Sequence, residues 1–285
     1  MIARTPVDLT AVRNRHPHHF GPPSRERRLM LALGAGALLL LLVGMAQLGF
    51  FSGAFLGGIG KLGEVAGLML PPNPGDWAHV RLYAMSLVET VAISFLGTLG
   101  ASILAVPIAL LAAKNVTTQR VLRFLSRRSL DTIRSVDILI WALIWINVVG
   151  LGPFAGVLAI MTSDLGNFGK LFSEAIEAAD RRAVEGIVST GGGRLLGIRF
   201  GILPEVFPVL ASQVLYFFES NTRSATIIGI VGAGGIGLHL AEAIQTLELQ
   251  QSSFIILMIL ITVAAIDVVS SQLRFALIGR RGGAA

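Results

Sequence analysis

Long uninterrupted apolar runs are the feature that most constrains how this chain can fold. The first run, Leu29 to Phe51, holds about 20 residues and carries no charge from Leu31 onward. At ~1.5 Å per residue, a helix of that length crosses the ~30 Å hydrocarbon core of a bilayer. A cleaved secretory signal is the alternative, but its apolar region is typically only about 7–15 residues long. We therefore predict a first transmembrane helix over 29-51.

Five further apolar runs are bounded by charges, prolines or glycine clusters, where a helix would leave the bilayer. They lie at about 82-113, 133-150, 152-170, 204-230 and 253-277. The Gly-rich stretch 226-240 is too short to count as another span. With 53% hydrophobic and 14% charged residues, the chain belongs to the membrane class. We predict an all-α, polytopic protein of about six transmembrane helices, with a core domain over 82-277.

The positive charges predict the orientation of these spans, because Lys and Arg are retained on the cytoplasmic side. Of the 23 Lys and Arg residues, all but Lys61, Arg81 and Arg223 lie on one face of a six-span topology. That face holds six in 1-28, six in 114-134, five in 165-203 and three in 274-285. We therefore predict a multi-pass protein of the cytoplasmic membrane. Its two tails, 1-28 and 278-285, would be cytoplasmic, and 52-81 would form an extracytoplasmic loop.

Composition argues against several kinds of site and partner. The chain has no cysteine, so neither a disulfide nor a Cys-based metal site can form. His16, His18 and His19 lie in the N-terminal tail, where a solvated segment is the simpler interpretation. We predict no metal and no catalytic residue. The net charge of +6 could indicate nucleic-acid binding, but the Arg residues are scattered and lack an aromatic-interleaved patch.

The loop over 173-204 is long enough to have a function of its own. Glu185 is followed by Gly191 six residues later, and then by Leu203 and Pro204. This spacing resembles the EAA loop of ABC importer permeases. Gly191 can adopt the positive φ of a sharp turn between two helices, and Pro204 suits the first turn of the next helix.

The loop departs from the motif at three positions. Gly186 and Ile187 stand in place of two alanines, and Gly201 stands in place of an apolar residue. The resemblance implies that Glu185, Gly191, Leu203 and Pro204 couple this chain to an ATPase.

Four longer stretches resemble the phosphonate-type permeases of ABC importers. They are ETVAISFLGTLGASILAVPIALLAAKN (89-115), RSVDILIWALIWINVVGLGPFAGVLAI (134-160), GKLFSEAIE (169-177) and ESNTRSATIIGIVGAGGIG (219-237). Asp137 replaces the Glu that we expect in this family. The resemblance runs from about Glu89 to Gly237 and implies the MetI-like fold of type I ABC importer permeases.

The resemblance also implies a set of partners. They are a second copy of this chain, two ATP-binding subunits, an extracytoplasmic substrate-binding protein and the surrounding lipid, with a phosphonate, phosphate or phosphite anion as cargo. The sequence has no G-x-x-x-x-G-K-[ST] loop, so ATP and Mg²⁺ would be bound by the ATPase subunits. The chain itself would be a transport subunit without a cofactor, not an enzyme.

A glycine pattern at 232-237 imitates a dinucleotide-binding fingerprint. Gly232, Gly234 and Gly237 fit G-x-G-x-x-G, with Gly235 between them. A Rossmann site needs alternating strands and helices, whereas the flanking segments here have the length of membrane helices. We predict that these glycines serve close helix packing or a broken-helix turn near the outer membrane face.

Ionisable residues within predicted spans are candidates for the translocation pathway, because they are costly in a bilayer unless they face protein or water. Glu219, Asn221 and Arg223 lie in or beside the fifth span. The alternative is that Glu219 and Arg223, four residues apart, only neutralise each other. Glu89 could face the cavity or stabilise the start of its own helix. Asp267 could meet a partner subunit or a neighbouring helix.

The main competing function is a secondary transporter driven by an ion gradient. It would predict paired repeats with matched broken helices, and the sequence shows no convincing repeat. A membrane enzyme would need a convergent set of His, Asp or Glu, and no His lies in a predicted span.

Overall fold

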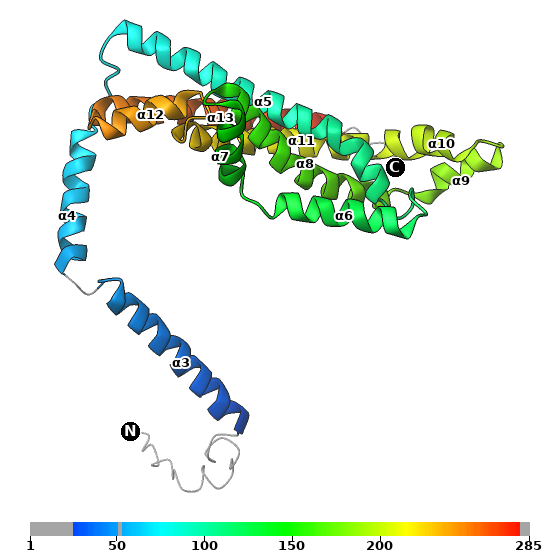
Figure 1. The fold of residues 1–285 in the computed structure, drawn as a ribbon, viewed down its shortest axis with the longest axis horizontal. Coiled ribbons are helices and arrows are strands. Elements are labelled where there is room, and N and C mark those ends of the chain that lie inside the picture. Colours follow the sequence, from blue (N-terminus) through cyan, green and yellow to red (C-terminus); the bar gives the residue numbers. More distant parts are fainter. Residues whose placement is uncertain (1–24, 51–52, 280–285) are drawn as a thin grey trace, which may run out of the picture. The chain divides into compact units, whose positions relative to one another are not determined.

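In a computed structural model, which describes residues 25–50 and 53–279, the chain folds into helices joined by short segments (Figure 1). No strand occurs within these ranges, and the all-α prediction is confirmed. The chain divides into two compact units, Met1–Ala66 and Gly67–Ala285. The helices are α3 (Arg25–Gln47), α4 (Gly53–Leu68), α5 (Trp77–Ala112), α6 (Arg120–Arg134), α7 (Ile138–Val149), α8 (Pro153–Ala178), α9 (Arg181–Ser189), α10 (Arg194–Leu196), the π-helix η1 (Gly197–Ile202), α11 (Leu203–Ile230), α12 (Ile236–Gln245) and α13 (Leu249–Gly279).

The first unit contains α3 and most of α4. Helix α3 has 23 residues and a mean hydropathy of 2.5 over its most apolar window, enough to cross a membrane. This agrees with the first predicted span. Most of the predicted N-terminal tail (1–24) and the end of the C-terminal tail (280–285) lie outside the described residues.

The predicted extracytoplasmic loop, 52-81, contains a helix that the sequence analysis did not anticipate. Helix α4 fills Gly53–Leu68 and crosses the division between the two units. It ends before a segment with three prolines, at 71, 72 and 74, which lack the N–H donor that a helix needs. Helix α5 then begins at Trp77, whose N–H donates to the side chain of Asp76 at 2.6 Å.

Helix α8 packs along α5 in the second unit and also contacts α6, α7 and α11. Glycines set the close approach of these backbones. A Cβ added at Gly97 of α5 would lie 2.7 Å from the side chain of Ile160. A Cβ added at Gly156 of α8 would lie 2.8 Å from the carbonyl oxygen of Ala233. Small residues therefore define the positions of the core helices.

The described residues contain four helices that are long and apolar enough to cross a membrane, or five if one bent pair counts as a span. The four are α3, α5, η1 with α11, and α13. The sequence analysis predicted about six transmembrane helices. The run at 152-170 forms α8, which is 26 residues long. Its polar residues, including Asp164 and Lys170, make it less apolar than the four helices that qualify as spans.

The run at 133-150, predicted as a single span, is instead bent. Helices α6 and α7 meet at an angle of 89° (Figure 1). Asp137 produces the break, because its side chain accepts from the N–H of Leu139 at 2.8 Å and caps α7. Arg127 of α6 forms an ion pair with Glu177 of α8 and donates to the carbonyl of Ala112 at 2.9 Å. The Arg-rich helix α6 is thereby tied to the ends of α5 and α8.

Candidate functional sites on α11 and the helical segment before it

Helix α11 carries polar side chains on two different faces. Residues two apart on an α-helix point in nearly opposite directions, whereas residues four apart share a face. Asn221 consequently faces the core of the unit, while Glu219 and Arg223 lie together on another face. The structure thus separates three residues that the sequence analysis had grouped as one candidate pathway.

The inner face of α11 joins a buried network, here called the inner polar network and made of Thr98, Asp164, Asn167 and Asn221. The Asn221 amide donates to Thr98 Oγ1 at 2.8 Å and to Asp164 Oδ2 at 2.5 Å. Asn167 donates to the other oxygen of Asp164 at 3.3 Å. Asp164 is only 3% exposed and Asn221 4%. The network therefore connects α5, α8 and α11 through the two buried hydrogen bonds of Asn221.

Asp164 is the residue of this network that the sequence analysis did not single out. It lies in the middle of the run at 152-170. The same argument that drew attention to Glu219, the cost of an ionisable residue in a span, would have identified it. A second polar contact between helices lies nearby, where the hydroxyls of Ser94 and Thr222 are 3.3 Å apart.

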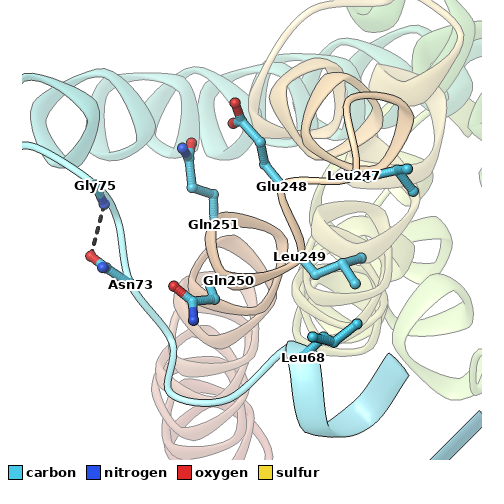
Figure 2. Close-up of a pocket in the computed structure, with 8 residues that line it drawn as sticks. All are labelled: Leu68, Asn73, Gly75, Leu247, Glu248, Leu249, Gln250 and Gln251. Carbon is cyan, nitrogen blue, oxygen red and sulfur yellow. Dashed lines mark hydrogen bonds between the residues drawn. The ribbon is translucent and has the colours of Figure 1, made fainter. Parts of the chain in front are cut away.

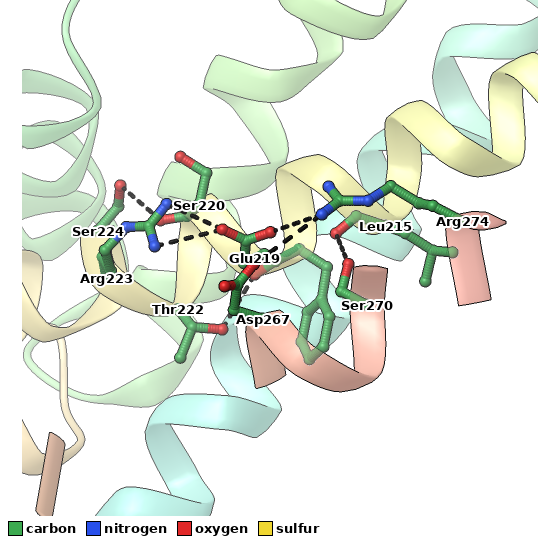
Figure 3. Close-up of polar contacts among 10 residues, drawn as sticks. Leu215, Glu219, Ser220, Thr222, Arg223, Ser224, Asp267, Ser270 and Arg274 are labelled. Carbon is green, nitrogen blue, oxygen red and sulfur yellow. Dashed lines mark hydrogen bonds and ion pairs between the residues drawn. The ribbon is translucent and has the colours of Figure 1, made fainter. Parts of the chain in front are cut away.

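The other face of α11 carries charges that extend to α13, here called the ion cluster and made of Glu219, Arg223, Asp267 and Arg274 (Figure 3). Arg223 donates to Glu219 Oε1 at 3.3 and 3.4 Å. Arg274, on α13, donates to Glu219 Oε2 at 3.2 Å. Asp267 lies 4.0 Å from Arg274. The predicted pair of Glu219 and Arg223 exists, but Arg274 is a second partner that sequence spacing could not reveal.

The members of the ion cluster differ in exposure. The side chain of Glu219 is 10% exposed, that of Arg274 21% and that of Arg223 50%. Arg keeps its charge when partly desolvated and presents planar donors that fit the oxygens of phosphoryl groups. Arg223 is thus the more exposed of the two arginines. Asp267 contacts Arg274 of the same helix, α13.

Glu89 contacts the start of another helix. Its Oε1 accepts from the N–H of Gly235 at 3.1 Å, and the neighbouring Thr90 Oγ1 accepts from the N–H of Ile236 at 2.8 Å. These groups satisfy the free N–H donors at the first turn of α12, where a negative charge is favourable. The sequence analysis had considered only the cavity and the helix that carries Glu89. Glu89 therefore helps to cap α12, and its role in the pathway stays a prediction.

The predicted glycine candidates form the sharp turn between α11 and α12. Gly232, Gly234 and Gly235 have φ values of +102°, +81° and +76°, which side chains other than glycine rarely adopt. A Cβ at Gly237 would overlap the backbone of Thr226 and Gly229. The predicted close packing and broken-helix turn are therefore present, and the flanking elements are helices.

The segment that resembles an EAA loop has the predicted helix-turn-helix form. Helix α9 is followed by a turn at Gly191, with φ of +85°, and Pro204 lies in the first turn of α11, next to Leu203. Glu185 is exposed on α9. A Cβ at Gly201 would lie 3.2 Å from the Val184 side chain. The departure from the motif at Gly201 thus allows α9 to pack closely against η1.

A second contact ties this segment to α11. Glu205, in the first turn of α11, accepts from the N–H of Asp180 at 2.9 Å. Asp180 in turn caps α9, since its side chain accepts from the N–H of Arg182 at 3.0 Å. Helix α9 is therefore connected mechanically to the helix that carries both polar faces.

A pocket of about 360 Å³ lies beside the turn between α12 and α13 (Figure 2). Asn73 and Gly75 line one side, and the residues from Leu247 to Gln251 line the other. The N–H of Asn73 donates to the carbonyl of Gln250 at 3.2 Å, and Tyr83 donates to Gln251 Oε1 at 2.6 Å. Among residues 25–50 and 53–279, no group of three His, Cys, Asp or Glu is placed to hold a metal ion.

Comparison with known proteins decides among the function classes. Residues 105–281 match the family described as "Binding-protein-dependent transport system inner membrane component". The chain belongs to this family. This membership confirms that the chain is a transport subunit of the inner membrane, and it excludes the interpretation as an enzyme.

Two relatives agree with that assignment, and a solved structure has a similar fold. The phosphite transport system permease protein PtxC of Stutzerimonas stutzeri is 34% identical over 219 residues, covering 77% of this chain and 78% of that protein. The phosphate-import permease protein PhnE of Mycolicibacterium smegmatis is 36% identical over 210 residues, covering 74% of this chain and 39% of that protein. An inward-facing structure of the MetNI methionine ABC transporter has a TM-score of 0.63 at 16% identity, covering 71% of this chain and 99% of that chain.

The structural likeness confirms the expected ABC importer permease fold. It covers the fold alone, because the sequence identity is low. Membership of a binding-protein-dependent transport family implies a substrate-binding partner.

Proposed function

We propose that this inner-membrane component carries phosphorus oxyanions, such as phosphonate, phosphite or phosphate, and is driven by separate ATPase subunits. Similarity to permeases named for phosphite and phosphate supports this cargo. The observation that carries the proposal is the half-exposed Arg223 on the membrane-length helix α11, held by the buried carboxylate of Glu219. A charged side chain at such a position must face water or protein instead of lipid. Arg223 therefore supplies a weak, transient contact for a passing anion.

Helix α9 is the surface proposed to receive the ATPase. Glu185 lies exposed on it, and Gly191 shapes the turn that follows. Val184 packs on Gly197 and Gly201 of η1, which continues directly into α11. A push on α9 would consequently reach the helix that carries Arg223 and Asn221 through rigid contacts.

A second copy of the chain is proposed to complete the pathway. The exposed half of Arg223 supports this proposal, since burial against a partner copy and its water-filled axis would avoid the cost of lipid exposure. The positive charges of the Arg-rich helix α6 and of the segment 181-199 support a cytoplasmic location for both termini and for α9.

The coupling role can be tested in the assembled transporter. Glu185→Ala or Gly191→Val should leave membrane insertion intact but weaken ATPase assembly or uncouple ATP hydrolysis from uptake. Glu242→Ala, an exposed acid on α12, is the matched control and should behave as the parent. Normal coupling in both variants would show that α9 is not part of the interface with the ATPase.

Co-purification provides a broader test of the energy source. A P-loop ATPase should purify with this chain, and reconstituted uptake should require ATP. Uptake that follows an ion gradient without any ATPase would instead establish the secondary transporter.

The orientation can be tested by cysteine labelling, for which the cysteine-free chain needs no prior substitution. A cysteine added after Ala285 should react only with reagents that reach the cytoplasmic side. Labelling from outside would reverse the proposed location of the C-terminus and of α9.

A further inference from the structure

The two oxygens of Glu219 are held by arginines from different helices (Figure 3). Oε1 accepts from Arg223, four residues away on α11, and Oε2 accepts from Arg274 on α13. Loss of either arginine therefore leaves one charged partner on the carboxylate. This matters because the side chain of Glu219 is only 10% exposed, and a buried carboxylate without a counter-charge is strongly unfavourable.

The two arginines are not equally available to a ligand. Arg274 is 21% exposed, its guanidinium lies 5.8 Å from the centre of the Tyr216 ring, and Asp267 is 4.0 Å away. Ser270, one turn earlier on α13, donates to the carbonyl of Leu215 at 3.0 Å and joins the two helices there. Arg223 is 50% exposed and lies on the same helix as its carboxylate. Arg274 is thus anchored, whereas Arg223 can turn away.

We propose that Arg274 is the fixed counter-charge of Glu219 that frees Arg223 to bind the anionic cargo. While an anion occupies Arg223, Arg274 keeps the buried carboxylate neutralised. When the anion leaves, Glu219 draws Arg223 back and prevents tight retention of the cargo. Arg274 is a positioning residue in this scheme and does not touch the anion. The inference rests on the proposed function, because it needs an anionic cargo at Arg223.

The test uses the assembled transporter, purified in detergent without added phospholipid so that lipid phosphate cannot compete. The variant Ser224→Cys places the only thiol of this chain next to Arg223. Inorganic phosphate at Arg223 should slow the alkylation of this thiol, and the half-protecting phosphate concentration measures binding. Arg274→Gln should raise that concentration by about tenfold, because Arg223 must then remain with Glu219. Arg274→Lys keeps the charge and should change it by less than about threefold.

The decisive variant is the double change Glu219→Gln with Arg274→Gln. Without the carboxylate, Arg223 no longer needs a substitute partner, so protection should return to within about twofold of the parent. A purely structural clamp by Arg274 predicts unchanged protection in folded Arg274→Gln protein, or no recovery in the double variant, and either result overturns the inference. If Arg274→Gln fails to assemble, the double variant and Arg274→Lys still decide. Absence of protection by phosphate, phosphite and methylphosphonate in the parent would overturn the anion contact itself, and the inference with it.

Discussion

The two polar faces of α11 differ in what surrounds them. The inner polar network joins Asn221 to Asp164 and Thr98, and these three side chains are at most 4% exposed. The ion cluster lies on the other face and leaves half of the Arg223 side chain accessible. The inner polar network and the ion cluster each contain an ionisable residue, and both bridge helices. Under the proposed function, polarity within this membrane helix has two uses, fixing neighbouring helices and offering a group to cargo, and exposure distinguishes the two.

The largest effect on assembly is expected from the inner face. Asp164→Leu would leave the Asn221 amide without one of its two buried acceptors, at a cost of about 1–3 kcal/mol. The thermal unfolding temperature of the purified complex should fall clearly. Asp164→Asn retains an acceptor oxygen and should lower it much less. An unfolding temperature unchanged in Asp164→Leu would mean that the network does not fix α5, α8 and α11.

Changes in the ion cluster should instead reduce uptake and leave assembly intact. Arg223→Ala should reduce uptake by about tenfold while the complex still assembles, because Arg274 continues to neutralise Glu219. Arg223→Lys should retain part of the activity, since the positive charge remains. Uptake of inorganic phosphate in proteoliposomes and thermal unfolding, measured on the same preparation, separate the two properties.

The pair change Glu219→Gln with Arg223→Gln sharpens this prediction. If the pair only stabilises α11, the double variant should assemble and transport at the parental rate. We expect assembly with reduced uptake. Uptake at the parental rate would show that Arg223 is not the anion contact.

The smallest effect is expected at the edge of the inner face. Thr222→Ala removes the hydroxyl that lies 3.3 Å from that of Ser94, and hydrogen bonds between membrane helices contribute about 0.6 kcal/mol on average. Thermal unfolding should shift by only a few degrees. Thr226→Ala is the control, since the Thr226 hydroxyl bonds to the carbonyl of Thr222 within its own helix. An equal shift in the two variants would show that the contact with Ser94 contributes nothing.

Much of the architecture follows from sequence, because lipid-facing helices carry their apolar character on every side. Helix α3 is the clearest example, with 23 residues and a high mean hydropathy. The turns were also predictable where glycine chemistry is local, as at Gly191 and in the segment from Gly232 to Gly237. Pro204 was correctly placed at the start of a helix.

The remaining features depend on contacts between distant segments. Helix α8 is packed against α5, α6, α7 and α11, so Asp164 can be buried there. The bend before α7 depends on one cap at Asp137. Arg274 reaches Glu219 across 55 residues, and Glu89 reaches Gly235 across 146. Periodicity and spacing describe one helix at a time and cannot predict such pairs.

The π-helix η1 has a consequence for how α11 could move. Its wide turn is closed by a hydrogen bond from the N–H of Leu203 to the carbonyl of Ile198, five residues earlier. In an α-helix this bond spans four residues, so the turn of η1 holds one residue more. Tightening that turn to an α-helix would rotate everything beyond it by about 100° and shift it by ~1.5 Å along the axis. The accessibility pattern of single cysteines along α11 would then move by one position. In a helix with one sealed face and one accessible face, a displacement of a single residue is enough to exchange which side chains meet the cargo.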